Sequence, residues 1–257
     1  MKKIIFILLV LGLMQPCFNS YAQQVAIGLR GGISIPNLSL GSEADPLNIG
    51  YTSRLTSDAA LFTEIKLSGL LSLQPMIEYS AQGGTKDGMQ ALQPPAQVVT
   101  AYKANGLTAP KYLYANFKSE AKINYLMLPV LLKLGFNLGD RSPFRFYVDG
   151  GPYIAVLLNA NEVTSGAGDL YTDKEGTKQL PYTGVQSFNS TQDIRYRTNS
   201  TNIGAEGNIG ISYKLNRSSI FIEGGGNYGF MNIQKGTDNG NNHTGAVTAS
   251  IGYAYWF

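Results

Sequence analysis

The final segment of the chain, which ends on an aromatic residue, constrains the fold most. From Val247 to Phe257 every second residue is apolar and mostly bulky, and the residues between them are mostly small or polar. One apolar face and one small or polar face are typical of the wall of an outer-membrane β-barrel. The pattern predicts the closing strand of such a barrel. The candidate signal for the barrel-assembly machinery is Tyr253, Tyr255 and Phe257.

The beginning of the chain has the pattern of a secretory signal peptide. Two lysines precede an apolar run over 4–14, and a small-residue pattern follows that ends at Ala22. The run is too short for a membrane-spanning helix, which needs roughly 20 residues. We therefore expect a cleaved leader over 1–22 and a single barrel domain over 23–257.

Composition narrows the class of the exported protein. The chain is 44% hydrophobic and only 14% charged, with 30 glycines and 16 tyrosines, which favours an all-β protein. Loss of the two leader lysines lowers the formal charge from +3 to +1. No basic surface for nucleic acid is expected at that charge. The only cysteine, Cys17, lies in the predicted leader, so the mature chain has no disulfide and no CxxC site.

Eight segments alternate with the period of a β-strand, and their links alternate strictly between short and long. The predicted strands cover 24–35, 57–67, 70–82, 122–137, 143–159, 201–215, 218–233 and 247–257. The long links cover 36–56, 83–121, 160–200 and 234–244. Bacterial membrane barrels have short periplasmic turns and longer extracellular loops. The fold predicted is an all-β, eight-stranded antiparallel transmembrane barrel in the outer membrane, with both termini in the periplasm.

Charged residues on the second strand face form a nearly balanced set. The predicted positive members are Arg30, Lys66, Lys133, Arg145 and Lys214, and the negative members are Glu64, Glu78, Asp149, Glu206 and Glu223. An eight-stranded barrel is only wide enough for side chains to fill, so inward charges need partners. We expect a lumenal ion-pair network that closes the bore. The alternative is a soluble sheet with these charges exposed, which leaves the segregation of loop lengths unexplained.

Four segments resemble a known family when taken in order. They are 28–38 (GLRGGISIPNL), 71–83 (LSLQPMIEYSAQG), 125–133 (YLMLPVLLK) and 147–154 (YVDGGPYI). The chain is similar in these segments to the PorT-like outer-membrane β-barrels of Bacteroidota, although Met127 stands where a glutamate is common in that family. The resemblance covers nearly all of the mature chain except the second and third outer loops. It implies a small barrel and, as an alternative role, an accessory factor of type IX protein secretion.

An enzymatic role is the competing class, because some small outer-membrane barrels modify lipid A. Such chemistry commonly needs a histidine with a serine and a carboxylate in hydrogen-bond reach. His243 with Ser200 or Ser250 and Glu162 is the set that this chain offers. The nearest oxygen ligands for a metal are Asp169, Asp173 and Glu175, whose spacing does not match an EF-hand loop. We expect no enzyme activity, no metal and no cofactor.

The role that the sequence favours is a monomeric barrel that recognises a ligand or partner through its outer loops. Aromatic residues in the two longest loops are the candidate contacts, since exposed aromatic side chains make good anchors. They are Tyr102, Tyr112, Tyr114 and Phe117 in the second loop, and Tyr171, Tyr182, Phe188 and Tyr196 in the third. Packing of the loops on each other is the alternative. The expected partners are outer-membrane lipid, the assembly machinery and a secretion-system or surface protein.

Overall fold

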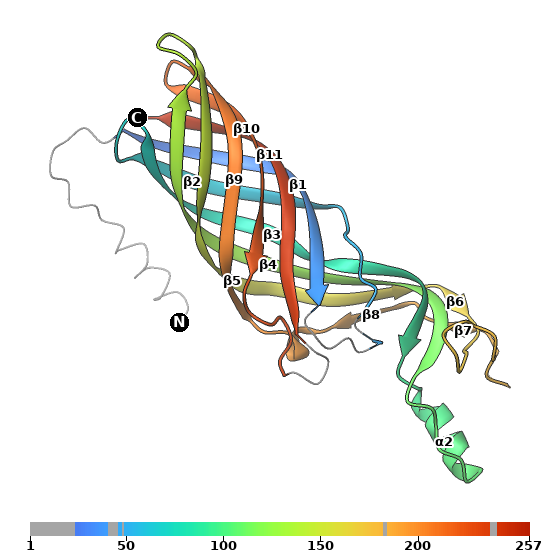
Figure 1. Ribbon diagram of the computed structural model, residues 1–257. Coiled ribbons are helices and arrows are strands. Elements are labelled where there is room, and N and C mark those ends of the chain that lie inside the picture. Colours follow the sequence, from blue (N-terminus) through green and yellow to red (C-terminus); the bar gives the residue numbers. More distant parts are fainter. Residues whose placement is uncertain (1–23, 41–45, 48, 182–183, 237–240) are drawn as a thin grey trace.

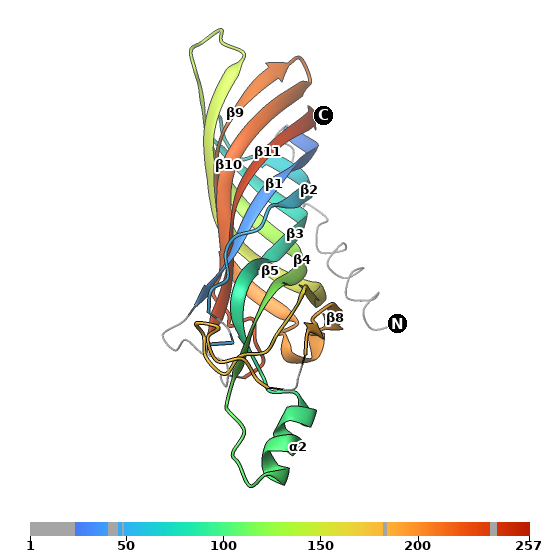
Figure 2. The ribbon, with the colours of Figure 1, turned by 90° about the vertical axis from the view of Figure 1, so that its right-hand side faces the viewer.

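The computed structural model describes residues 24–40, 46–47, 49–181, 184–236 and 241–257, so the predicted leader lies outside it. Eight long strands form a closed antiparallel ring (Figures 1 and 2). They are β1 (Val25–Leu40), β2 (Thr56–Lys66), β3 (Leu71–Leu92), β4 (Leu113–Asn137), β5 (Phe144–Ser165), β9 (Thr201–Leu215), β10 (Ser218–Gly229) and β11 (Asn242–Trp256). Pairing of β1 with β11, from Ala26 opposite Trp256 to Leu40 opposite Asn242, closes the ring. The predicted eight-stranded barrel is confirmed.

Among the described residues, five short elements lie outside the ring. They are α2 (Ala96–Ala104), β6 (Ala167–Gly168), β7 (Gln186–Ser187), β8 (Ser190–Asp193) and the 3-10 helix η1 (Arg195–Arg197). Strand β8 pairs with the last residues of β5, beyond the point where β9 begins. In the described part of the chain, no helix has the length and hydropathy needed to cross a membrane.

The two ends of the barrel differ in their connections, as predicted. The links 67–70, 138–143 and 216–217 are short and lie at the end that also holds the carboxyl terminus, which we call the turn rim (Figure 1). The links 41–55, 93–112, 166–200 and 230–241 lie at the other end, which we call the loop rim. Asn216 has a positive φ of 49°, which suits the two-residue turn between β9 and β10.

Three strands extend much farther toward the loop rim than the sequence predicted. The ladder between β3 and β4 continues from Gly83 opposite Lys122 to Leu92 opposite Leu113. Strand β5 runs to Ser165 instead of ending at residue 159. The predicted loop over 83–121 is therefore wrong over 83–92 and 113–121, about half of its length. Polar composition hid these segments, but each strand satisfies the backbone hydrogen bonds of its neighbour.

The strand faces are segregated as the alternation predicted. Large apolar side chains stand on the outer surface, and most of the charged side chains of the strands point inward and are buried. The most exposed apolar side chains of the strand walls include Ile27, Leu29, Leu61, Ile77, Ile154, Ile209, Ile222, Val247 and Ile251. This arrangement is that of a barrel with an apolar exterior rather than an apolar interior.

The lumen is filled by three layers of side chains. Nearest the turn rim, Phe62, Tyr147 and Phe221 pack with other buried apolar residues. A charged layer follows, and beyond it toward the loop rim lies an apolar layer that includes Tyr125, Met127 and Tyr153. Met127 and Leu131, which break the polar pattern of β4, belong to the two apolar layers. The inner face of the barrel is thus apolar at the two levels where the apolar layers lie.

Candidate functional site

Arg30 is the centre of the charged layer. Its Nη1 donates to Glu223 Oε1 at 2.6 Å, and its Nη2 donates to Glu78 Oε2 at 2.6 Å and to Glu206 Oε1 at 2.7 Å. The four side chains are only 1–3% exposed. Because these residues come from β1, β3, β9 and β10, one guanidinium joins opposite sides of the barrel. Charge-assisted hydrogen bonds of this kind are the strong ones.

Neutral donors extend the charged layer. Asn208 Nδ2 donates to Asp149 Oδ1 at 2.9 Å and to Glu206 Oε1 at 3.0 Å. The Tyr147 hydroxyl donates to Glu223 Oε2 at 2.7 Å. A second ion pair joins Lys133 Nζ to Glu64 Oε2 at 3.3 Å, nearer the turn rim. These contacts cross-link the strands and occupy the bore.

The predicted charge set divides into a buried part and a rim part. Seven of its members are buried in the lumen: Arg30, Glu64, Glu78, Lys133, Asp149, Glu206 and Glu223. The other three lie at the turn rim. Lys66 donates to Gln24 Oε1 at 2.6 Å, and Arg145 reaches the carbonyl oxygens of residues 69 and 70 at 3.4 and 3.5 Å. Lys214 is exposed, and in the described part of the chain no ion pair includes Lys66, Arg145 or Lys214.

The buried lumenal charges are therefore not balanced, contrary to the expectation from the sequence. Asp58, which is not a member of the predicted charge set, is 2% exposed on the inner face of β2. The buried layer then holds two basic side chains, Arg30 and Lys133, and six carboxyl groups. Position 58 shares the phase of Glu64 in β2, so the alternation pattern could have identified it. The lysine and arginine side chains at the turn rim instead reach water from the strand ends, as these long side chains commonly do.

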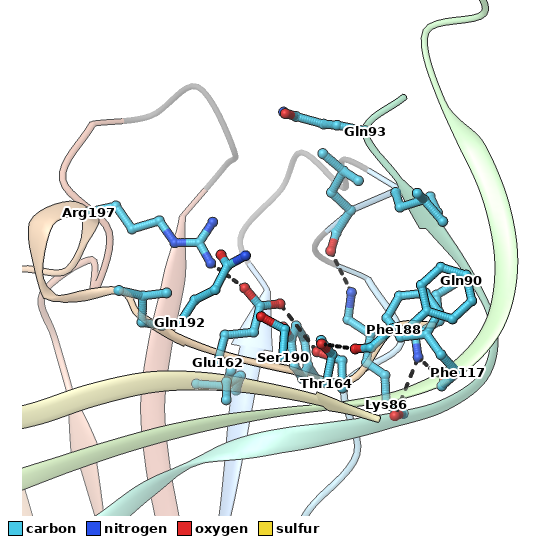
Figure 3. A pocket seen from close by; sticks show the side chains of 18 of the residues that line it. Lys86, Gln90, Gln93, Phe117, Glu162, Thr164, Phe188, Ser190, Gln192 and Arg197 are labelled. Atoms are coloured by element: carbon cyan, nitrogen blue, oxygen red, sulfur yellow. Dashed lines mark hydrogen bonds and ion pairs between the residues drawn. The ribbon is translucent and has the colours of Figure 1, made fainter. Parts of the chain in front are cut away.

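A cavity of about 530 Å³ opens at the loop rim (Figure 3). It lies above the apolar layer that contains Tyr125, Met127 and Tyr153. Its walls are the inner faces of the extended β3, β4 and β5, and residues of the segment 187–198 form another side. Its floor includes Leu38, Ile123 and Ile194, which belong to the apolar layer. The packed side chains of this apolar layer close the cavity on the side of the lumen. Its volume lies in the range of about 300–1,000 Å³ that is usual for ligand sites.

The charged groups of the cavity have partners within the protein. Arg197 forms an ion pair with Glu162, and Ser119 Oγ donates to the other carboxylate oxygen at 3.2 Å. Lys86 Nζ donates to the Leu47 carbonyl at 2.5 Å and lies 4.3 Å from the centre of the Tyr51 ring. Burial raises the pKa of Tyr51 to about 12, so this hydroxyl stays a neutral donor at neutral pH.

Two phenylalanines supply an aromatic surface at the cavity. Phe117 and Phe188 stack with ring centres 4.9 Å apart and an interplanar angle of 25°. The backbone carbonyl of Phe117 accepts a hydrogen bond from Gln90, and that of Phe188 accepts one from Thr164 at 2.5 Å. Gln90 and Lys86 lie in a segment that the sequence predicts as loop. Both continue the inner-face phase of Ser80 in β3, and extending that phase would have found them.

The tyrosines predicted as loop contacts lie apart from this cavity. Tyr102 packs against the small apolar cluster that contains Val98 of α2, and Tyr114 and Tyr171 form a backbone bridge. The Lys111 Nζ atom lies 4.9 Å from the centre of the Tyr112 ring. Tyr196 is 73% exposed, whereas Tyr182 lies outside the described residues. Of the aromatic residues selected from the sequence, Phe117 and Phe188 are the ones that line the cavity.

The residues of the enzyme alternative are separated by the barrel wall. His243 Nδ1 lies 3.2 Å from the Gly229 carbonyl, and its ring stacks on the outward-facing Tyr228. Ser250 is buried on the inner face of β11, while Glu162 is paired with Arg197 in the cavity. Within the described residues, no hydrogen bond joins His243 to Ser200, Ser250 or Glu162. The structure does not assemble that triad.

Of the candidate metal ligands of the third loop, Asp173 stabilises a turn. Asp173 accepts hydrogen bonds from the Thr177 hydroxyl at 2.5 Å and from the Lys178 backbone N–H at 2.7 Å. These donors lower the pKa of Asp173. Across the described ranges, no three His, Cys, Asp or Glu side chains are grouped to hold a metal ion.

The three residues of the candidate assembly signal face outward at the turn rim. Tyr253 is 41% exposed, Tyr255 38% and Phe257 72%. The Tyr253 hydroxyl lies 2.6 Å from Ser218 Oγ, and the rings of Tyr255 and Phe257 meet edge to face at 5.3 Å. They therefore form an outward-facing aromatic surface at the end of the described chain.

A comparison with solved structures finds several proteins that are similar to this chain over most of its length. Neisserial surface protein A is 12% identical, with 90% of this chain and 99% of that chain covered and a TM-score of 0.41. OprG from Pseudomonas aeruginosa is 12% identical, with 90% and 95% covered and a TM-score of 0.39. The outer membrane protease OmpT from Escherichia coli is 10% identical, with 93% and 99% covered and a TM-score of 0.40.

A comparison with curated proteins finds no match. The model of one protein family, described as the outer membrane protein beta-barrel domain, matches residues 21–235. That match covers well over half of the chain and includes seven of the eight ring strands. The chain is a member of the outer membrane protein β-barrel domain family.

Proposed function

We propose that this outer-membrane barrel is a non-enzymatic surface protein that binds a ligand in the cavity at its loop rim. The observation that carries the proposal is the construction of the cavity. Paired strands β3, β4 and β5 form its walls, and the apolar layer closes its floor. A site built on strands is held more precisely than one built on loops. Ligand therefore enters and leaves by the same mouth.

The proposal places the loop rim outside the cell, the termini in the periplasm and the apolar exterior against lipid. Residues 23–257 contain no cysteine, so single cysteines can report each rim. We expect Gln179→Cys, at the loop rim, to react on intact cells with a membrane-impermeant maleimide. Arg141→Cys, in a turn-rim link, should react only after the outer membrane is opened. The reverse pattern of labelling would show that the barrel has the opposite orientation in the membrane and would contradict the proposal.

Filling the cavity should abolish ligand binding without harming the barrel. Ser190 lines the cavity from β8 and is exposed, so Ser190→Trp adds bulk there. A panel of soluble peptides, oligosaccharides and metabolites is tested for compounds that raise the unfolding temperature, since a ligand that binds the native state stabilises it. We expect at least one such shift to be lost in Ser190→Trp and kept in the control Gln179→Trp. A panel in which every shift survives Ser190→Trp would rule out this site.

The alternative role is an accessory factor of type IX protein secretion, based on the PorT-like resemblance. In the structure, Arg30 of the first resembling segment pairs with Glu78 of the second at 2.6 Å, so these two segments meet in the lumen. This role differs from simple ligand binding in one outcome, because deletion of the gene would then leave secreted cargo in the periplasm. The terminal aromatic surface is the proposed contact for the assembly machinery.

A further inference from the structure

The charged side chains that line the cavity are engaged by other groups of the protein. Glu162 and Arg197 neutralise each other, and Lys86 is engaged by the Leu47 carbonyl. Lys235 Nζ donates to the carbonyl oxygens of residues 195 and 196 at 3.4 and 3.3 Å. An anionic or cationic ligand would have to compete with these contacts.

Neutral polar groups dominate the rest of the lining. They are the amide side chains of Gln90, Gln93, Asn189, Gln192, Gln234 and Asn242, and the hydroxyls of Ser119, Thr164, Ser187, Ser190 and Thr198. Gln93 follows β3 and Gln192 lies in β8, so they approach from different walls (Figure 3). In the described part of the chain neither side chain makes a hydrogen bond. Each therefore offers one acceptor and two donor hydrogens to an occupant.

The aromatic pair gives the same cavity an apolar surface. Phe117 and Phe188 are both only half-buried, so part of the stacked pair stays open to the cavity. A pyranose ring combines an apolar face of C–H groups with a rim of hydroxyl groups. A flat aromatic surface suits the first, and amides that both donate and accept suit the second.

We propose that the occupant is a short neutral oligosaccharide, with a sugar face on Phe117 and Phe188 and hydroxyl groups bound by Gln93 and Gln192. This inference rests on the proposed ligand-binding function and names its ligand class. The cavity volume of about 530 Å³ limits the bound part to a few sugar units.

The test uses the full barrel in detergent or nanodiscs on an array of neutral, acidic and sulfated oligosaccharides. We expect binding to neutral members of the array. The double variant Gln93→Ala with Gln192→Ala should bind them roughly tenfold more weakly, as the loss of two ordinary hydrogen bonds predicts. Gln179→Ala, an exposed glutamine outside the cavity, should bind as the unchanged protein does. Equal unfolding temperatures of the three proteins show that folding is intact.

Two results would overturn the saccharide assignment. One is binding confined to acidic or sulfated members, and the other is neutral binding that the double variant leaves unchanged. If only a peptide or metabolite binds and Ser190→Trp blocks it, the saccharide assignment fails and the ligand cavity stands. If Ser190→Trp blocks no compound at all, both fail together.

Discussion

Arg30→Met is expected to lower the free energy of unfolding of the barrel more than any other single replacement of a charged residue. The substitution removes the shared partner of Glu78, Glu206 and Glu223 and leaves their carboxyl groups buried in the lumen. Removing one partner of a buried ion pair costs about 3–5 kcal/mol, and here three carboxyl groups lose the same partner. The measurement is urea unfolding in lipid vesicles, followed by tryptophan fluorescence of Trp256, the single tryptophan.

The control is Lys214→Met, which removes one positive charge from an exposed side chain at the turn rim. That replacement should change the free energy of unfolding by no more than about 0.5 kcal/mol. Adding Glu78→Gln, Glu206→Gln and Glu223→Gln to Arg30→Met should recover part of the loss, because neutral amides are cheaper to bury than carboxylates. Equal stability of Arg30→Met and Lys214→Met would show that the charged layer does not hold the barrel together.

The alternation of apolar and polar side chains predicted the barrel. In a strand with a period of two residues, knowing which face one residue is on fixes the face of all the others. In β9 the phase that exposes Ile203 and Ile209 also buries Glu206, so the sequence indicates the wall and its lumenal charge together. A shift by one residue would reverse both faces, which makes this signal hard to mistake. The same phase also selected most of the buried charged layer from the sequence alone.

The cavity could not be predicted in the same way. Its walls are strand extensions such as 83–92, where glycine and polar residues on both faces look like loop. Pairing of β3 with β4 makes these residues strands, and that is a contact between segments distant in the sequence. Phe188 and Arg197 reach the cavity from the third loop, whose path depends on the pairing of β8 with β5. Local patterns do not encode such docking.

Large aromatic side chains in the lumen lie over glycines on the neighbouring strand. Phe62 is paired with Gly28, Phe221 with Gly252, Tyr147 with Gly210 and Tyr153 with Gly204. A Cβ atom at any of these glycines would lie within 2.1–2.4 Å of an atom of the adjacent ring or strand. These glycines cannot be identified from the sequence, since the match between a glycine and a ring appears only when the strand register is known. We expect each pair to be intolerant of a larger residue at the glycine.

Gly210→Ala is the sharpest test of this packing. The new Cβ would lie 2.4 Å from Cζ of Tyr147 and 2.8 Å from the Ile222 carbonyl oxygen. The ring has no easy way to move, because its hydroxyl donates to Glu223 and the Lys133 ammonium lies 4.3 Å from its centre. Overpacking of this kind costs about 1–3 kcal/mol and occasionally more, so we expect a fall in the free energy of unfolding at the upper end of that range.

Gly207→Ala is a matched control three residues away on the same strand. Its new Cβ would lie 3.5 Å from the nearest atom, the Asp149 carbonyl oxygen, which is ordinary van der Waals contact. Replacing glycine where the native backbone accepts alanine commonly stabilises by about 0.4–1 kcal/mol, because the unfolded chain loses freedom. The two variants should therefore move the urea midpoint in opposite directions. If Gly210→Ala unfolds at the same urea concentration as Gly207→Ala, the lumen is looser than this packing requires, and the aromatic layer does not depend on its glycines.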